Sequence, residues 1–590
     1  MMLDTTQERV AKICSRHEKM KADKYPWLFT WQLIAEYVLS RKSNFSYPIM
    51  PGQFLTGKIF DSTAPIACRK AASSTVGALW PNSQQSFMIE PSAIMSREDA
   101  ESDEVKLFYH NLTERVRSAF GHPMSGFQLA LEEHMMDQFA FGTSGIYAEE
   151  DESDNDKPFT FKAVDAKICA IAEGADGFVD TVYQDLELTT RQCVQKYQYE
   201  NCSKPVQEMY MRGDFDEKVN VLHAVEPRMD AASDGGFGAA GKPVASIHVD
   251  KTNDNHVLKE GGMSEMPIFI VRFWKTMREV WGRSPAGEAM SDILEVNYKR
   301  ETTIVAEEKI LNPPMAFYHD GSLSSGVLKL GAGDVSVFNI NGRMGEFNNK
   351  VFEQLITIGD IKPTYERIAV IQADIKENFF NNDLNDLSND SRQTAFEASI
   401  RDQMRGQQLN TIYTRQIIEL LVRIIRYVFN VMAGRGLLYA PDDNPIPAAV
   451  QKLIDKKRDA YKITFISPAA RILQAEELKG IQACAAFATQ MAPVVPSVVD
   501  NYDWDAMARH IQDLTGAPSF VLTAQDTMTQ QRQQRAAAQQ AQQEQMMNHV
   551  QAQIAELLGK GAQAGSKAGL PLQALMPQPQ GSNNGGQTAA

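Results

Sequence analysis

The segment from Ser284 to Pro314 constrains the fold most strongly, because it marks both ends of a long helix. Ser284 occupies the N-cap position, and Pro285 follows at the first helical position, where its missing N–H group costs no hydrogen bond. The helix is predicted to run to about Leu311 and to stop at Pro313 and Pro314. At 1.5 Å per residue it forms a rod of roughly 40 Å.

A second helix follows after a glycine-rich interval. Residues 315–362 are typical of short strands and turns, and the next helix spans about Pro363 to Glu377. The polar segment FFNNDLNDLSNDS, from Phe379 to Ser391, is predicted to be a loop. Asn and Asp favour turns over helices because their side chains bond to the local backbone.

A very long helix is expected after this loop. Thr394 and Glu397 have the spacing of a capping box, which opens a helix. Gly434 and Gly436 are residues of the kind that commonly end one. The predicted helix therefore runs to about Ala433.

The remaining chain mixes helical and strand-like segments, so the expected fold class is α+β and mainly helical. Apolar residues recur at near-helical spacing in the N-terminal segments, and strand-like patterns dominate the region that follows. The helical segments are 1–45, 61–87 and 103–150, and the strand-like segments are 159–164, 178–184, 220–225, 245–250 and 268–273.

The C-terminal part is predicted to be mostly helical over residues 441–522, with breaks at prolines. From about Gln525 to Leu558 the chain is dominated by Gln and Ala, which are good helix formers. Propensity alone rarely holds such a helix in water, so it needs neighbours, which symmetry-related copies would supply. The Gly-, Gln- and Pro-rich tail, residues 559–590, is expected to be disordered.

Composition excludes some classes of protein. A hydrophobic content of 43% and a charged content of 23% are ordinary for a folded soluble protein. The formal net charge of −15 argues against a protein that grips nucleic acid by its overall charge, although it leaves room for one that lets DNA slide past. The most apolar long stretch, Ile417 to Met432, is interrupted by charged residues and is not typical of a transmembrane span.

The cysteines and the N-terminus indicate the compartment. Six cysteines are scattered without a C-x-x-C pair, so neither a zinc site nor a redox motif is indicated. Such scatter suits a reducing compartment, where thiols are buried as small hydrophobes. The charged N-terminal stretch lacks the apolar core of a signal peptide. We therefore expect a protein that works without a membrane, in a cytoplasm or inside a particle assembled there.

One glycine-rich stretch imitates a nucleotide-binding motif without completing it. Gly236, Gly238, Gly241 and Lys242 fit both G-x-G-x-x-G and the first part of a Walker A loop. Pro243 stands where that loop needs a hydroxyl for Mg²⁺, and proline offers no N–H to a phosphate. A glycine-rich loop between two strands is the favoured interpretation.

Catalytic and metal motifs are missing from the sequence. It contains no H-E-x-x-H or G-x-S-x-G signature. The acidic run from Glu149 to Asp156 lacks the glycine and the distal glutamate of an EF-hand, and it is interpreted as a solvated loop. The sequence therefore indicates no catalytic residue, no cofactor site and no metal ligand, and we predict that the chain is not an enzyme.

Six strings give the sequence a family resemblance. Together they sample most of residues 25–535, and they stand in the order found in the portal (head-to-tail connector) proteins of short-tailed, podovirus-type bacteriophages, which the chain resembles. The strings are IFDSTAPIACRKAASSTVGALWP (59–81), VLHAVEPR (221–228), VWGRSPAGEAMSDILEVN (280–297), KILNPPMAFYHDG (309–321), RQTAFEASIRDQM (392–404) and FISPAARILQAEE (465–477).

This resemblance implies a homo-oligomeric ring of about twelve subunits at one capsid vertex. Double-stranded DNA would pass through the ring during packaging and ejection. The resemblance also implies a virion location, assembly in the host cytoplasm, and contacts with a terminase, a tail adaptor protein, and the major capsid and scaffolding proteins. Since the sequence has no ATP-hydrolysing motif, the power for packaging would come from the terminase.

The resemblance also divides the chain into the parts of a portal-protein fold. Two stem helices would carry a clip between them, and a wing and a crown would surround the stem. The implied parts are the wing (1–283), the stem helices (284–311 and 363–378), the clip (312–362), the tunnel loop (379–391), the long wing helix (392–440), the crown region (441–524), a C-terminal barrel-like helix (525–558) and a disordered tail (559–590).

The tunnel loop and the first stem helix carry the residues expected to face DNA. Copies of the loop would form a polar collar, in which aspartates repel DNA and asparagines make transient hydrogen bonds. A net acidic stem helix would keep adhesion to the phosphates weak. The loop residues are Asn381, Asn382, Asp383, Asn385, Asp386, Asn389 and Asp390, and the stem candidates are Glu295, Lys299 and Arg300.

Alternatives remain open for these residues and for the whole chain. Lys299 and Arg300 could form one ring of transient phosphate contacts, or Lys299 could pair with Glu295 one turn away. The loop could be an ordinary solvent loop. The chain as a whole could be a non-catalytic virion scaffold or assembly protein, or a nucleotide-binding enzyme that uses residues 236–242.

Overall fold

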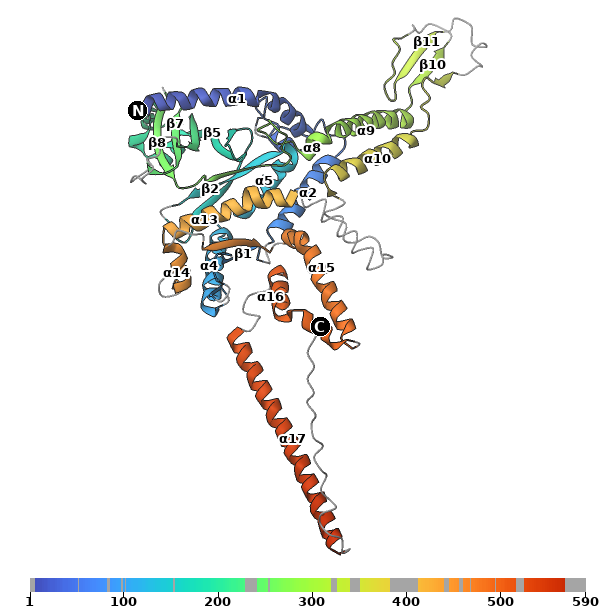
Figure 1. Cartoon of the computed structure of the whole chain (residues 1–590). Helices are drawn as coiled ribbons and strands as arrows, with labels where there is room; N and C mark the ends of the chain where they lie inside the picture. The colour runs from blue at the N-terminus through green and yellow to red at the C-terminus, as the bar shows by residue number, and fades with distance from the viewer. Residues whose placement is uncertain are drawn as a thin grey trace, which may run out of the picture. The chain divides into compact units, whose positions relative to one another are not determined.

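The computed structural model describes residues 6–50, 52–81, 85–96, 99–100, 102–151, 154–228, 241–252, 255–319, 326–339, 351–381, 412–439, 445–455, 460–466, 468–493, 495–515 and 525–567. The chain divides into two compact units. The first comprises residues 1–96 and 104–516, and the second comprises residues 97–103 and 517–590. Figure 1 shows their elements. In the part of the chain that the structure describes, no helix is long and apolar enough to cross a membrane.

A five-stranded antiparallel sheet forms one layer of the first unit, in the order β4-β5-β6-β7-β8. Helix α1 (Thr6–Tyr37) covers one face of it, where Val10 and Ile13 pack in one cluster with Leu222 and Ile247. The strands are β4 (Cys169–Glu173), β5 (Val179–Thr189), β6 (Lys218–Pro227), β7 (Val244–Asp250) and β8 (His256–Met263).

Two short helices cover the opposite face of this sheet. They are α6 (Thr190–Tyr197) and α7 (Lys204–Arg212). Val219 and Val221 of β6 join the cluster that these helices form. Because successive side chains of a strand point to opposite faces, Val221 and its neighbour Leu222 serve the two different layers.

A second, three-stranded antiparallel sheet has the order β3-β2-β9 and contacts helix α5. Aromatic side chains fill the core near it. The buried Trp31 ring lies against Phe45 and Trp281, and its N–H donates to the carbonyl of Phe141 at 3.1 Å. The elements here are β2 (Thr143–Glu150), β3 (Phe159–Val164), β9 (Ile268–Arg272), α2 (Thr63–Leu79), α4 (Asp103–Gly121) and α5 (Phe127–Phe141).

Two long helices then run beside each other and carry a small sheet at one end (Figure 1). The first is α8 (Pro285–Glu288) followed by α9 (Met290–Leu311), and the second is α10 (Lys362–Asn378). The predicted helix boundaries are confirmed, with one interruption at Ala289. The sheet has the order β11-β10-β12, with β10 (Met315–His319), β11 (Val335–Asn339) and β12 (Phe352–Gln354).

The rest of the first unit is mainly helical. A π-helical turn, η5 (Ile417–Leu421), leads into α13 (Val422–Gly434), which ends at Gly434 as predicted. Strands β1 (Phe87–Pro91) and β13 (Tyr461–Phe465) pair antiparallel with each other, and like β4 and β8 they were not predicted from the sequence. The remaining helices are α14 (Ala448–Asp455), α15 (Pro468–Met491) and α16 (Trp504–Thr515).

The second unit contains helix α17 (Gln525–Lys567). Its side chains are exposed over residues 530–557. The helix was predicted to end at Leu558, but it continues to Lys567. The glycines there do not stop the helix, and the first proline of the tail is Pro571.

One further prediction is wrong. Residues 143–150 were expected to continue a helix, but they form β2. Helix α5 ends at Gly142, which has the left-handed conformation typical of a helix C-terminus. The following segment pairs with β3 and β9 on its two sides. Only Ile146, Tyr147 and Ala148 of this strand are apolar, so its sequence lacks the regular alternation that would distinguish it from the helical segment before it.

Candidate conduit and docking elements

The base of the α8–α9 rod is held by a close approach of two backbone segments. Gly142 has φ +77°, and a Cβ atom there would lie 2.5 Å from the carbonyl oxygen of Gly282. A Cβ on Gly282 would meet the carbonyl oxygen of Gly142 at 2.5 Å. The Ser284 hydroxyl then accepts the N–H of Gly287 at 3.0 Å, as expected of an N-cap. These contacts set the direction in which the rod leaves the sheet.

Helices α9 and α10 also form hydrogen bonds with the segment that leads into α2. The side-chain oxygen of Asn297, on α9, accepts the backbone N–H groups of Phe60 and Asp61 at 2.9 and 3.1 Å. Gln372, on α10, donates to the Asp61 carboxylate at 2.6 Å. Asn297 is buried, so this junction fixes the positions of α9 and α10 along their axes relative to the start of α2.

The charged stem candidates form a small network across the helix pair. Lys299 pairs with Glu295 at 3.3 Å, so the intrahelical pair considered from the sequence is formed. Arg367 of α10 reaches the same carboxylate at 3.6 Å. Arg300 makes no ion pair with any residue that the structure describes, which leaves its charge available for another partner.

The small sheet at the end of the rods is poorly covered. Its central strand β10 pairs in parallel with β11 and antiparallel with β12. Parallel strand pairs are normally covered on both faces. Here Val327 is 82% exposed and Phe352 is 55% exposed, and only Ala316 and Ser336 are buried among the described residues of the three strands. Such a surface is typical of a site that another protein covers.

The expected tunnel loop lies almost wholly outside the described residues. Of the seven loop residues predicted to face DNA, the structure describes only Asn381, which is 8% exposed. The other six, Asn382, Asp383, Asn385, Asp386, Asn389 and Asp390, and the capping residues Thr394 and Glu397, fall in the range 382–411, of which nothing is described. In this chain, then, Asn381 is not exposed for contact with DNA.

The two flanks of residues 382–411 are both anchored at the end of β9. On one side, Phe380 lies against the rings of Phe273 and Trp274, with centroids 6.5 and 6.3 Å away. On the other side, the Arg415 guanidinium donates to the carbonyl of Arg272 at 3.3 Å. The ends of this segment are therefore held by the same piece of chain.

A buried arginine that the sequence analysis missed strengthens this anchor. The Arg272 guanidinium pairs with Glu173 and lies 3.7 Å from Glu419, in the π-helical turn. The backbone N–H of Arg272 donates to the Glu419 carboxylate at 3.3 Å. The two partners are far from Arg272 in the sequence, and their charges gave no local signal. The one available hint was that Arg272 and Glu419 each stand in an otherwise apolar stretch of sequence.

Lys242, the last residue of the glycine-rich stretch, lies in surroundings that disfavour phosphate. Lys242 lines a pocket of about 370 Å³ together with Glu150, Glu265 and Arg435, at the C-terminal end of α13. A helix C-terminus carries partial negative charge, and the two carboxylates add to it. Gly236 and Gly238 lie outside the described residues. The described residues around Lys242 do not form an anion site.

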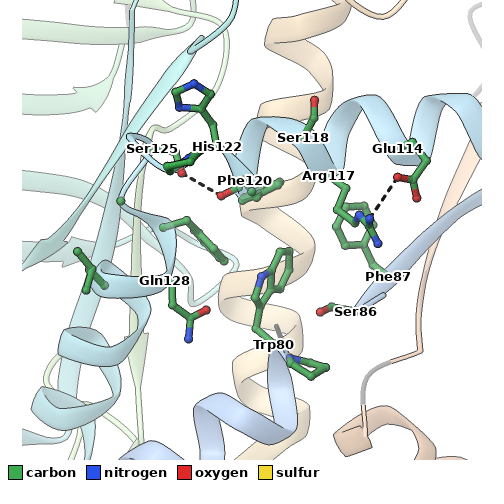
Figure 2. A pocket seen from close by; sticks show the side chains of 16 residues that line it. Trp80, Ser86, Phe87, Glu114, Arg117, Ser118, Phe120, His122, Ser125 and Gln128 are labelled. Atoms are coloured by element: carbon green, nitrogen blue, oxygen red, sulfur yellow. Dashed lines mark hydrogen bonds and ion pairs between the residues drawn. The ribbon is translucent and has the colours of Figure 1, made fainter. Parts of the chain in front are cut away.

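A larger hollow of about 600 Å³ lies between α2, β1, α4 and α5 (Figure 2). Its wall is aromatic, with Trp80 and Phe127 at a centroid distance of 4.8 Å. The Ser125 hydroxyl donates to the Phe120 carbonyl at 2.9 Å, and His122 accepts the N–H of Met124 at 3.2 Å. These two polar groups are engaged with the backbone, so neither is an activated nucleophile. Within the described residues, no group of three or more His, Cys, Asp or Glu side chains could hold a metal ion.

The fold and these elements define a structural protein with a protruding helical pair. The profile of the family described as bacteriophage head to tail connecting protein matches residues 10–522. The chain belongs to this family, which confirms the resemblance seen in the sequence. The prediction that it is not an enzyme is supported by the family and by the names of its relatives.

Two relatives match over nearly their full lengths. A probable portal protein of Bordetella phage BPP-1 is 24% identical over 575 residues, which cover 96% of this chain and 96% of the relative. The portal protein of Salmonella phage epsilon15 is 24% identical over 575 residues, or 95% of this chain and 96% of the relative. Two solved structures, the virion of a native gene transfer agent particle and the neck of an empty one, match with TM-scores of 0.30 and 0.31, 10% identity, and coverage of 76% of this chain and 95% of theirs.

Proposed function

We propose that this chain is a portal subunit, about twelve copies of which close into a ring at one capsid vertex around the path of double-stranded DNA. The observation that carries this proposal is the family match over residues 10–522. The names of the two phage relatives support it. In this role the protein belongs to the virion, is assembled in the host cytoplasm and meets the major capsid and scaffolding proteins.

The helix pair and its small sheet take the stem and clip roles in this proposal. Helices α9 and α10 would surround the channel, and residues 312–362 would form the clip. The exposed apolar side chains of the clip support a docking role, because they need a cover that the described chain does not supply. A terminase would dock there during packaging, and a tail adaptor would follow.

The remaining parts follow the same plan. Residues 1–283 would form the wing, 392–440 the long wing helix and 441–524 the crown. Copies of α17 would form a barrel. An exposed apolar stripe on that helix, with the 3–4–3 spacing at which helices associate, supports this arrangement. The stripe consists of Met547, Val550, Ile554 and Leu557.

The proposed contacts with DNA are few and weak. Of the basic pair on α9, Lys299 is already engaged by Glu295, so Arg300 is the better candidate for a transient phosphate contact. The tunnel-loop role is proposed for Asn382, Asp383, Asn385, Asp386, Asn389 and Asp390. Asn381 is left out of this group because its side chain is buried.

Complementation of a phage that lacks this gene tests the proposal. Without the chain, heads should contain no packaged DNA, and the wild-type gene should restore filled heads. With Arg300→Gln, filling should slow about twofold, because a ring of phosphate contacts is lost. Lys299→Gln is the matched control and should change the rate less. The readout is the fraction of DNA-filled heads over time.

The outcomes separate the function from the site. Normal filling without the chain would refute the portal role. Equal slowing by both substitutions, or none by either, would leave the role intact and reject Arg300 as the DNA contact.

A further inference from the structure

Helix α9 presents a line of exposed side chains along one side. They are spaced three, four or seven positions apart, which places them on the same face of a helix. Three of them are large and apolar, and the most exposed, Tyr298, is 68% exposed. Two others are glutamates. We call this set the α9 stripe, and it consists of Leu294, Tyr298, Glu301, Val305 and Glu308.

Helix α10 carries a second exposed line of the opposite character. It has two alanines at its centre, a lysine at each end and one glutamate, so its net charge is positive. We call this set the α10 stripe, and it consists of Lys362, Glu366, Ala369, Ala373 and Lys376. The ion pairs that the structure describes on the two helices all use Glu295, so within the described residues both lysines and all three glutamates of the stripes form none.

The two stripes turn away from the contact between the helices. Helices α9 and α10 lie side by side and run in opposite directions (Figure 1). Arg367 of α10 reaches Glu295 of α9 at 3.6 Å, which marks the side on which they meet. Glu301 lies about 120° around α9 from Glu295, and Lys362 lies about 140° around α10 from Arg367. The stripes are therefore two different surfaces on the two flanks of the helix pair.

We propose that the α9 stripe of one subunit packs against the α10 stripe of the next subunit around the ring. The proposal rests on the proposed portal function, because it needs a closed ring of copies. A head-to-tail ring joins two different surfaces of each subunit, and the two flanks of the helix pair supply them. Large side chains on one stripe fit against the alanines of the other, and acidic side chains meet basic ones.

A second copy of the chain suits the α9 stripe better than DNA does. Glu301 and Glu308 would repel phosphates, and the apolar side chains between them offer nothing to a phosphate backbone. Exposed apolar side chains in a line are typical of a surface that another protein covers. The α10 stripe offers both the lysines and the small side chains that the α9 stripe lacks.

Ring symmetry also predicts which charges meet. For helices that run along the ring axis, rotation about the axis leaves every residue at its own height. From the Arg367–Glu295 contact, Glu301 lies about 9 Å toward the small sheet along α9, and Lys362 lies about 7.5 Å in the same direction along α10. Glu301 of one subunit therefore meets Lys362 of the next.

Charge exchange in the full chain tests this pair. Glu301→Lys should raise about tenfold the concentration at which half of the chain is in rings, because like charges then meet at every interface. Lys362→Glu should do the same, and the double variant should recover the wild-type value within about twofold. The readout is native mass spectrometry over a dilution series. Asp374→Lys is the control, because it is exposed on α10 about 120° around the helix from Lys362, and it should leave ring formation unchanged.

Engineered cysteines test the contact directly. In a Cys484→Ser background, which removes an exposed thiol, Glu301→Cys and Lys362→Cys are combined and the assembled protein is oxidised. We expect a ladder of covalent multimers on a denaturing gel without reductant, whereas each single cysteine variant should stay monomeric. A link within one chain would overturn the proposal, because the two residues would then lie on the same flank.

The outcomes separate this interface from the portal role. Rings that form in the wild-type chain but ignore both charge changes, and that give no ladder, would overturn the interface and leave the portal role intact. A wild-type chain that forms no rings at any concentration would overturn both.

Discussion

A Gly142→Ala chain should lose about 4 kcal/mol of folding free energy, the largest effect that we expect from a single added methyl group. Two costs combine. The backbone at Gly142 has φ +77°, which strains any residue with a Cβ atom. The added Cβ would also lie within 2.6 Å of backbone atoms of Gly282 and Arg283, which cannot rotate away as a side chain can.

The loss should appear in urea denaturation as a lower midpoint with an unchanged slope. Gly77→Ala is the matched control, because it lies in helix α2 and its Cβ would meet nothing within 4 Å. That change should be neutral or stabilise the chain by up to about 1 kcal/mol. Equal stability of the two variants would contradict the close approach at the base of the rod.

Acid should destabilise the chain through a stacked pair of buried histidines. His223 and His248 face each other across β6 and β7, with ring centroids 4.0 Å apart and planes 7° from parallel. Burial lowers the pKa of His223 to about 3. Burial, followed by the neighbouring His223, lowers the pKa of His248. Both rings are neutral in the folded chain at neutral pH.

The direction of the effect follows from these shifts. Above about pH 6.5 the histidines are neutral in both the folded and the unfolded chain, so they add no pH dependence. Below about pH 6.5 the unfolded chain binds protons at these histidines that the folded chain does not bind. The free energy of unfolding therefore decreases as the pH falls toward the lowered pKa. Between pH 7 and pH 5 the loss is about 2 kcal/mol for each histidine.

His248→Phe isolates this contribution. The Nδ1 atom of His248 has no hydrogen-bond partner among the described residues, so a phenyl ring should cost less than about 1.5 kcal/mol at pH 8. The loss between pH 7 and pH 5 should shrink by about 2 kcal/mol, measured by urea denaturation at both pH values. His549→Gln, at an exposed position on α17, is the control and should keep the wild-type pH dependence. An unchanged pH dependence in His248→Phe would contradict the argument.

Local signals in the sequence predicted the helices well. Ser284, Pro285 and the proline pair after Leu311 act within a few residues of the backbone that they shape, and the structure has the helix ends where they indicate. The five strand-like segments were likewise recognised from their own composition. For β2 the local pattern was ambiguous, since both of its edges are paired and buried.

Features made by distant residues could not be predicted in this way. Strands β1 and β13 pair across more than three hundred residues, and the Arg272–Glu419 contact joins residues that lie 147 positions apart. The Glu295–Lys299 pair could be anticipated as one of two alternatives for Lys299, because it lies within one helical turn.

End-on electron micrographs of the purified chain test the central claim most directly. A portal subunit must close into a ring by a contact between two different surfaces, repeated around an axis. We expect closed rings of about twelve copies with a central hole. Monomers, dimers or open filaments alone, at concentrations where the chain is fully folded, would contradict the account of this protein as a DNA conduit.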